Sequence, residues 1–208
     1  MIRALRPIIA LILLSACGSV PVTHYYTLAP APAKQLSTRG SAVLSIDELS
    51  VASAYTDQRI AYRPAPYRLE YYDYHQWAAP LSMALTDYLR DALSESGRFQ
   101  QVATERRSAT TLVLGGRLAA FEEVDVTPQH WVGRVDIELF LEEPRSGKVV
   151  WSRRFREQQD LKTRDPAGLA EALSAALSRI VTQAVPEIWS TVDRAERVRE
   201  MQAARSGD

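Results

Sequence analysis

The clearest pattern in the chain is an alternation of apolar and charged residues over 130–143, HWVGRVDIELFLEE. Apolar side chains from Trp131 to Leu141 fall mostly on one face of this pattern, and charged side chains fall mostly on the other. Successive side chains of a strand point to opposite faces, so the segment predicts a strand with one buried and one solvated face. The sequence PRSGK at 144–148 predicts a turn, and 149–158 predicts a returning strand.

Other stretches upstream also favour strands. They occupy residues 42–49, 58–63, 67–74, 99–105 and 110–126. Pro64-Ala65-Pro66 separates the second stretch from the third, which predicts a turn between two paired strands. Gly115 and Gly116 interrupt the last stretch, which predicts a bulge or a close approach of neighbouring backbone.

Two segments change to the period of a helix. After Pro80, leucines and small apolar residues from Leu81 to Leu93 share one helical face, and Gly97 stands where it would end the helix. A second helix is predicted to begin at Asp165-Pro166, where an N-cap residue precedes proline at the first helical position.

The apolar stripe of this second helix runs to about Trp189, and Pro186 predicts a kink near its end. The charged tail over 193–208 could extend this helix and is expected to fray at its end. Strands, a helix, more strands and a final helix predict an α+β domain over residues 42–192. The simplest arrangement is an antiparallel sheet with two helices packed on one face.

The N-terminus has the order of a secretory signal peptide over residues 1–16. A basic start containing Arg3 and Arg6 precedes an apolar run over 7–14, and two small residues follow. The apolar run is too short to cross a bilayer, which requires about 20 residues.

Leu14-Ser15-Ala16-Cys17 matches the bacterial lipobox, and Cys17 is the only cysteine in the chain. The match implies that Cys17 receives lipid and becomes the first residue of the mature chain. No cofactor other than this covalent lipid is expected. A secreted protein with an unused cysteine is the alternative interpretation. The second mature residue is Gly18 rather than the aspartate that retains lipoproteins in the inner membrane of some bacteria, which favours the outer membrane.

Residues 17–41 are rich in proline, alanine, serine and threonine and predict a lipidated, flexible tether. About 24 such residues reach at most roughly 80 Å when fully extended. Within the tether, HYYTLAP at 24–30 is more apolar than a spacer requires, which indicates a strand or a segment that packs on the domain.

Composition and charge argue against several classes of function. The chain has 25 basic and 25 acidic residues, and loss of the signal peptide removes two arginines, so no basic domain remains to bind nucleic acid. His24, His75 and His130 lack the spacing of a metal site. The pair Glu122-Glu123 is expected at a solvated strand end. No catalytic set stands out, so we expect no enzyme and no metal.

Residues 62–77, YRPAPYRLEYYDYHQW, contain an unusual concentration of aromatic side chains. Tyrosine and tryptophan combine a rigid apolar face with a polar tip and are enriched at interfaces. In the alternative interpretation, Tyr72 and Tyr74 pack beneath a helix. The candidate partner-binding residues are Tyr62, Tyr67, Tyr71, Tyr72, Tyr74 and Trp77.

Several of these marks together resemble the ABC-type transport auxiliary lipoprotein family, which includes the lipoprotein of the paraquat-inducible system. The resemblance rests on the lipobox, a Tyr-Tyr-Xaa-Leu segment, an Ile-Xaa-Tyr strand and a Trp-Ala-Xaa-Pro-Leu helix entry. The matching residues are Tyr25, Tyr26, Leu28, Ile60, Tyr62, Trp77, Ala78, Pro80 and Leu81.

The resemblance implies an outer-membrane lipoprotein, facing the periplasm, that docks the MCE-domain protein of a lipid transporter. A ring of identical subunits would fit around a tubular partner, which makes a homo-oligomer one expected arrangement. Two alternatives stay open on the sequence. One is a cofactor of another envelope machine, either a peptidoglycan synthase or a lipopolysaccharide-export barrel. The other is a carrier that holds lipid within its own domain.

Overall fold

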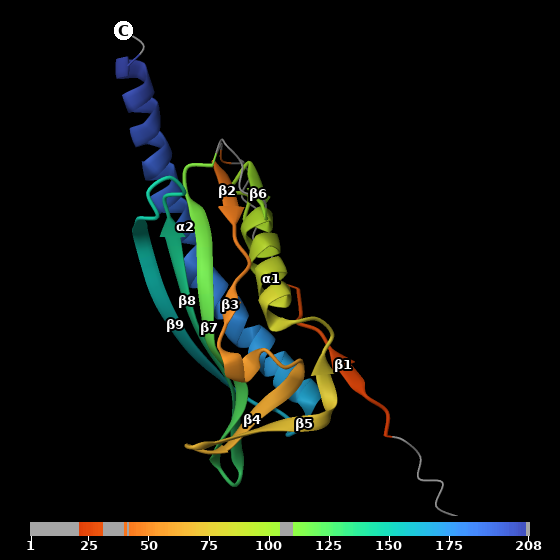
Figure 1. Ribbon diagram of the computed structural model, residues 1–208. Helices are drawn as coiled ribbons and strands as arrows, with labels where there is room; N and C mark the ends of the chain where they lie inside the picture. The colour runs from red at the N-terminus through yellow and green to blue at the C-terminus, as the bar shows by residue number, and fades with distance from the viewer. Residues whose placement is uncertain (1–20, 31–39, 41, 105–109, 207–208) are drawn as a thin grey trace, which may run out of the picture.

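The computed structural model describes residues 21–30, 40, 42–104 and 110–206, which form one sheet, two helices and a short 3-10 helix (Figure 1). The strands are β1 (His24–Tyr26), β2 (Val43–Ile46), β3 (Ser50–Val51), β4 (Arg59–Ala65), β5 (Arg68–Trp77), β6 (Gln101–Ala103), β7 (Val113–Thr127), β8 (His130–Glu142) and β9 (Val149–Asp160). The helices are α1 (Leu81–Glu95), α2 (Pro166–Ser206) and the 3-10 helix η2 (Ser53–Tyr55). The predicted α+β class is confirmed.

The sheet is built around the long strand β7. On one side β7 pairs antiparallel with β8, and β8 pairs antiparallel with β9, as the alternation predicts. On the other side β2, β3 and β4 lie one after another along β7, and all three are parallel to it. The sheet is therefore mixed rather than wholly antiparallel. Strands that are not joined to β7 by a hairpin carry no local signal for their direction. The sequence therefore did not predict that they run parallel to β7.

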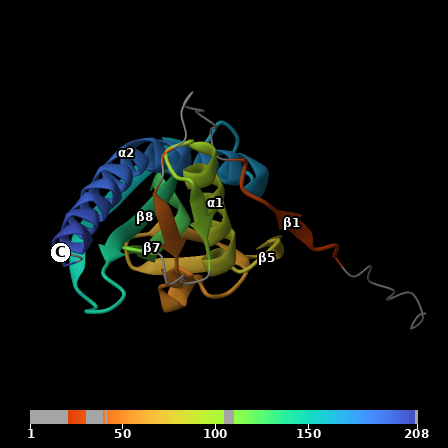
Figure 2. The ribbon, with the colours of Figure 1, turned by 90° about the horizontal axis from the view of Figure 1, so that it is seen from above.

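Both helices contribute to a single core. Figure 2 shows α2 crossing over β7 and β8, with α1 beside it. The apolar stripe of α2, from Leu169 to Val192, is buried together with Leu85, Leu89 and Leu93 of α1. The inward side chains of β8, among them Leu139, complete this cluster.

The predicted helix starts and the end of α1 are confirmed. Gly97 follows α1 with φ of 67°, a left-handed conformation that glycine adopts without steric cost. The carboxylate of Asp165 accepts a hydrogen bond of 2.7 Å from the backbone N–H of Gly168, so Asp165 caps α2. This cap holds the pKa of Asp165 below its usual value.

Helix α2 extends well past Trp189, where the apolar stripe predicted its end. It continues through Pro186 because Ile188 and Val192 remain buried against the core on the far side of the proline. Beyond them, the Glu196 carboxylate accepts a hydrogen bond of 3.3 Å from the backbone N–H of Val43. The charged segment over 193–206 therefore extends the helix, as its sequence allowed.

The two glycines of β7 mark a close approach. A Cβ atom on Gly115 would lie 2.6 Å from the Phe140 ring, and one on Gly116 would lie 2.9 Å from the backbone oxygen of Glu138. The irregularities in the β7–β8 pairing fall instead between Leu118 and Ala120 and between Asp125 and Thr127. Of the two predicted reasons for the glycines, close approach is the one that the structure bears out.

Candidate partner-docking site

The predicted aromatic segment forms a hairpin at one end of the sheet. We call residues 59–77, comprising β4, β5 and their turn, the aromatic hairpin. Strand β4 pairs antiparallel with β5 and parallel with β7, which carries the hairpin along the outer part of the central strand (Figure 1). The sequence signal for it was the pair of apolar stretches on either side of Pro64-Ala65-Pro66.

The hairpin presents two of its tyrosines to solvent. Tyr67 lies at the turn and is fully exposed, and Tyr74 on β5 is 45% exposed. On the neighbouring strand β1, Tyr25 is 64% exposed. Exposed tyrosines of this kind are available to a partner without any rearrangement of the fold.

Three other tyrosines of the predicted set are partly buried and bonded within the domain. The rings of Tyr62 and Tyr72 lie 4.7 Å apart. The Tyr62 hydroxyl donates to the carboxylate of Glu70. The Tyr71 hydroxyl donates a hydrogen bond of 2.8 Å to the backbone oxygen of Ala54. These side chains hold the shape of the hairpin, with only part of each ring facing outward.

Trp77 belongs to the core. Its side chain is 2% exposed, and its ring centroid lies 5.3 Å from that of Phe121. Trp77 ends β5 and precedes α1, so it fixes the junction of the hairpin with the helix. It therefore offers no surface to a partner.

The acidic pair Glu122-Glu123, expected at a solvated edge, is instead fully buried in the middle of β7. Because the two residues are consecutive on a strand, their side chains point to opposite faces of the sheet. The expectation failed because β7 is covered on both faces at this level. In the sequence, the signal that both faces of β7 are covered was the position of two adjacent acidic residues inside a strand pattern.

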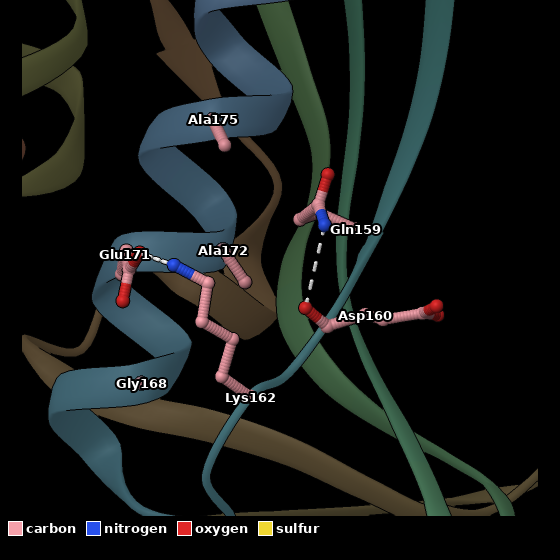
Figure 3. Close-up of a pocket in the computed structure, with 7 residues that line it drawn as sticks. All are labelled: Gln159, Asp160, Lys162, Gly168, Glu171, Ala172 and Ala175. Atoms are coloured by element: carbon pink, nitrogen blue, oxygen red, sulfur yellow. Dashed lines mark hydrogen bonds and ion pairs between the residues drawn. The ribbon is translucent and has the colours of Figure 1, made fainter.

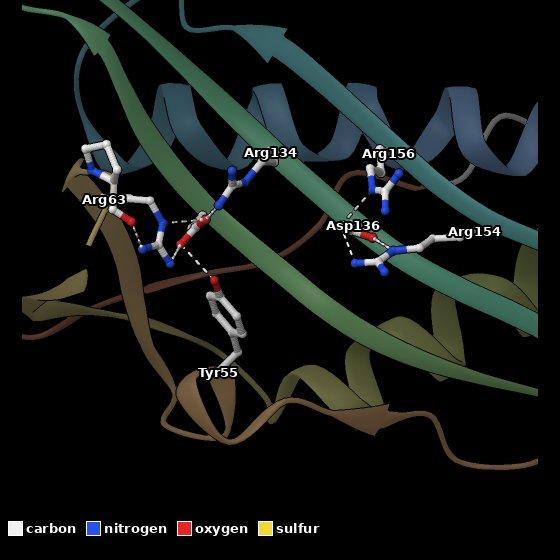
Figure 4. A network of polar contacts seen from close by, with 8 residues as sticks. Tyr55, Arg63, Arg134, Asp136, Arg154 and Arg156 are labelled. Atoms are coloured by element: carbon white, nitrogen blue, oxygen red, sulfur yellow. Dashed lines mark hydrogen bonds and ion pairs between the residues drawn. The ribbon is translucent and has the colours of Figure 1, made fainter. Parts of the chain in front are cut away.

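Glu122 is the centre of an ionic cluster on one face. Arg63 of β4 forms a bidentate pair with its carboxylate, with both N–O distances at 3.1 Å. Arg134 of β8 also donates to this carboxylate, and Tyr55 of η2 donates a hydrogen bond of 2.8 Å. Burial and this bond raise the pKa of Tyr55 to about 12. Figure 4 shows Tyr55, Arg63 and Arg134 converging on one point.

Glu123 occupies the other face, towards α2. It accepts a hydrogen bond of 2.9 Å from the Tyr72 hydroxyl and one of 3.4 Å from Arg164, in the loop before α2. Burial raises the pKa of Glu123, and burial next to its carboxylate raises the pKa of Tyr72. Through these bonds, Glu122 and Glu123 of β7 hold β4 and β5 in place.

Neither cluster is open to a substrate. Buried charges that are paired and hydrogen-bonded are stable inside a protein, whereas an unpaired one is very costly. Since both carboxylates are fully covered, we interpret them as structural cross-links. Farther along β8, the carboxylate of Asp136 pairs with Arg154 and Arg156, also drawn in Figure 4, and Arg154 lowers the pKa of Asp136.

A small pocket lies where the end of β9 meets the first turns of α2 (Figure 3). It has a volume of about 150 Å³, and the ion pair between Lys162 and Glu171 spans part of it. The lining residues are Gln159, Asp160, Lys162, Gly168, Glu171, Ala172 and Ala175. Its lysine already has an acidic partner, and we assign no ligand to the pocket.

Two classes of site find no support in the part of the chain that the structure describes. Its His, Cys, Asp and Glu side chains nowhere form a group of three or more that could hold a metal ion. None of its helices is both long enough and apolar enough to span a bilayer. Cys17 and the predicted signal peptide over 1–16 lie outside the described residues.

Known structures share this fold. Protein XCC0632 from Xanthomonas campestris is 22% identical, with a TM-score of 0.72 over 85% of this chain and 99% of that one. A second crystal structure, of an uncharacterized protein, is 15% identical, with a TM-score of 0.68 over 81% of this chain and 99% of that one. Comparison with curated protein sequences finds no match.

The family model described as "ABC-type transport auxiliary lipoprotein component" matches residues 26–185, from Tyr26 of β1 into α2. The matched region contains the whole aromatic hairpin, α1 and every strand from β2 to β9. The chain belongs to the ABC-type transport auxiliary lipoprotein component family.

Proposed function

We propose that this protein is an outer-membrane lipoprotein subunit of an MCE-type ABC transport system and that it docks the periplasmic MCE component. Lipids or other hydrophobic molecules would then cross the envelope through that component. The observation that carries the proposal is the aromatic hairpin, which lies at one end of the sheet and presents the fully exposed Tyr67 at its turn.

The contacts between the hairpin and β7 support this role. Arg63 and Tyr72 bind the buried carboxylates of Glu122 and Glu123, so the hairpin is tied to β7 on both faces. A surface that is rigid before binding loses less conformational entropy when a partner arrives. The exposed tyrosine is thus presented from a preorganised support.

The anchor is the second part of the proposal. Family membership agrees with acylation of Cys17, and stable attachment to a membrane takes more than one acyl chain. Gly18 at the second mature position favours the outer membrane. The protein would supply location and an interface, while the ATPase of the transporter would supply the energy.

Photocrosslinking in living cells tests the docking role. A photoreactive residue replaces Tyr67 at the tip of the hairpin. The matched control replaces Val149, which is 49% exposed at the start of β9 (Figure 1). We expect capture of an MCE-domain protein from position 67 and none from position 149.

Other products would point elsewhere. Capture of a peptidoglycan synthase or a lipopolysaccharide-export barrel would replace the transporter interpretation with a role in that machine. Capture of other copies of this chain alone would make the hairpin a self-assembly surface. Equal capture of an MCE-domain protein at both positions would show that the hairpin is not the specific docking surface.

A further inference from the structure

Strand β1 is fastened to the folded domain although it lies within the predicted tether. It pairs in parallel with the end of β5, with Tyr26 opposite Trp77. The backbone oxygen of Tyr26 accepts a hydrogen bond of 2.8 Å from the N–H of Ala78. The N–H of Ala29 donates one of 3.0 Å to the hydroxyl of Ser174 on α2.

Side chains reinforce this attachment. The hydroxyl of Tyr26 and the Nδ1 atom of His75 share a hydrogen bond of 2.8 Å. The rings of His24 and His75 stack with centroids 5.4 Å apart, and Leu28 packs against the core. Main-chain and side-chain contacts with β5 and α2 therefore hold residues 24–29 in place.

This attachment shortens the linker between the lipid on Cys17 and the folded domain. Only six peptide steps separate Cys17 from Thr23, the residue before β1. At 3.3 to 3.6 Å per residue, they span at most about 22 Å, roughly a quarter of the reach of the whole 17–41 segment. A lipid on Cys17 would hold β1 close to the bilayer surface.

Apolar and aromatic side chains gather where this linker joins the domain. Val22 is 72% exposed, Tyr25 is 64% exposed and Tyr74 is 45% exposed. Tyr25 lies opposite Gln76 in the β1–β5 pairing, two residues along from Tyr74. Tyrosine is enriched at membrane interfaces because its ring suits the headgroup region and its hydroxyl stays hydrated.

The position of α2 gives the domain a direction. The helix begins beside β1, since Ser174 bonds to Ala29, and it continues from there to Ser206. At 1.5 Å per residue this stretch is about 48 Å long. Figure 1 shows β1 at the end of the molecule where α2 begins and the C-terminus at the other end.

We infer that the end of the domain formed by β1 and the last residues of β5 faces the lipid bilayer to which the chain is anchored. Val22, Tyr25 and Tyr74 form the membrane-facing patch and lie against the headgroups. The C-terminal part of α2 and the β8–β9 turn point away from the membrane. The inference rests on the acylation of Cys17 in the proposed function.

Fluorescence quenching of the full, lipidated protein tests this orientation. Cys17 is the only native cysteine, so once it is acylated an introduced cysteine carries the only free thiol. Asp73→Cys places a bimane label beside Tyr74, and Arg145→Cys places one in the β8–β9 turn; both native residues are exposed. Each labelled protein is reconstituted into phosphatidylethanolamine–phosphatidylglycerol vesicles that contain a lipid with a nitroxide headgroup.

We expect the label at position 73 to be quenched at least threefold more than the label at position 145. Equal quenching, or stronger quenching at 145, would overturn the orientation. Flotation of the vesicles separates this failure from failure of the anchor. Protein that does not float with the vesicles lacks the lipid, and the proposed function and the inference then fail together.

Lengthening the linker between Cys17 and β1 provides a second test that leaves the fold unchanged. Twelve glycine and serine residues are inserted between Val20 and Pro21, ahead of β1 and of the contacts that Tyr26 and Ala29 make. We expect quenching at position 73 to fall several-fold while the thermal unfolding midpoint stays the same. Unchanged quenching at position 73 after the insertion would show that the short linker does not set the orientation.

Discussion

The Tyr72 hydroxyl donates a hydrogen bond of 2.9 Å to the carboxylate of Glu123, which joins β5 to β7 although β4 lies between them in the sheet. The contact ties the aromatic hairpin to the central strand from the face that α2 covers. Arg63 and Glu122 make the corresponding contact on the opposite face.

Loss of the Tyr72 hydroxyl should weaken the fold. Tyr72→Phe leaves the buried carboxylate of Glu123 without one of its donors, and an unsatisfied buried acceptor costs about 1–3 kcal/mol. We expect the free energy of unfolding, measured with urea, to fall by that amount. Tyr74→Phe is the matched control on the same strand and should stay within about 0.5 kcal/mol of the native protein. A Tyr72→Phe protein as stable as the control would contradict the structural role of this contact.

Stability should depend on pH through Glu123. Burial raises the pKa of Glu123 above its ordinary value of 4.5, so just above pH 4.5 the folded protein binds more protons than the unfolded chain. Stability therefore falls as the pH rises through this range towards the folded pKa. Glu123→Gln cannot ionise, and we expect its unfolding midpoint to fall less steeply than that of the native protein between pH 4.5 and 7.

Two other carboxylates define the control for this experiment. Burial also raises the pKa of Glu196, so the slope should decrease in Glu123→Gln without vanishing. Asp136 has the opposite sign. Arg154 lowers its pKa, so its contribution to stability is present above pH 3.8 and is lost as the pH falls below that value. Parallel pH profiles for the variant and the native protein would refute the role given to Glu123.

The two glycines of β7 should tolerate alanine differently. A Cβ atom on Gly116 meets the backbone oxygen of Glu138 at 2.9 Å, and backbone inside a paired strand cannot move away cheaply. A Cβ atom on Gly115 meets only the side chain of Phe140, which is partly exposed and can rotate. We expect Gly116→Ala to destabilise the protein by about 1–3 kcal/mol and Gly115→Ala by less. Thermal unfolding of both variants checks the order, and the reverse order would be inconsistent with these contacts.

Cys17→Ser should separate anchoring from folding. The described part of the chain begins at Pro21, after Cys17, and the first strand begins at His24. We expect the variant to keep its circular dichroism spectrum and unfolding midpoint but to leave the membrane fraction after cell lysis. Incorporation of labelled palmitate provides the direct readout. A Cys17→Ser protein that still incorporated palmitate would place the lipid on another residue.

The sequence was sufficient wherever the controlling interactions are local. Alternation over 130–143 predicted β8, and Asp165 with Pro166 predicted the start of α2, because strand faces and helix caps depend on neighbouring residues. Gly97 predicted the end of α1 for the same reason. The order of these elements then gave the α+β class.

Only the tertiary structure decided the features that depend on residues far apart in the chain. β2, β3 and β4 lie parallel to β7 because of how the chain returns to it, and nothing within each short strand records that direction. Likewise, α2 continues past Pro186 because Val192 finds a buried site in the core. Helix propensity alone could not show this, since packing of the apolar face supplies most of the stability of a helix in a protein.

The candidate site divides in the same way. Composition alone identified the tyrosine-rich stretch that includes Tyr67, because a single strand cannot bury so many aromatic side chains. Folding then sorted them: Trp77 went into the core, Tyr72 was bonded to Glu123, and Tyr67 stayed exposed at the turn. Burial and partnership depend on which distant segments cover each face, and that information exists only once the chain has folded.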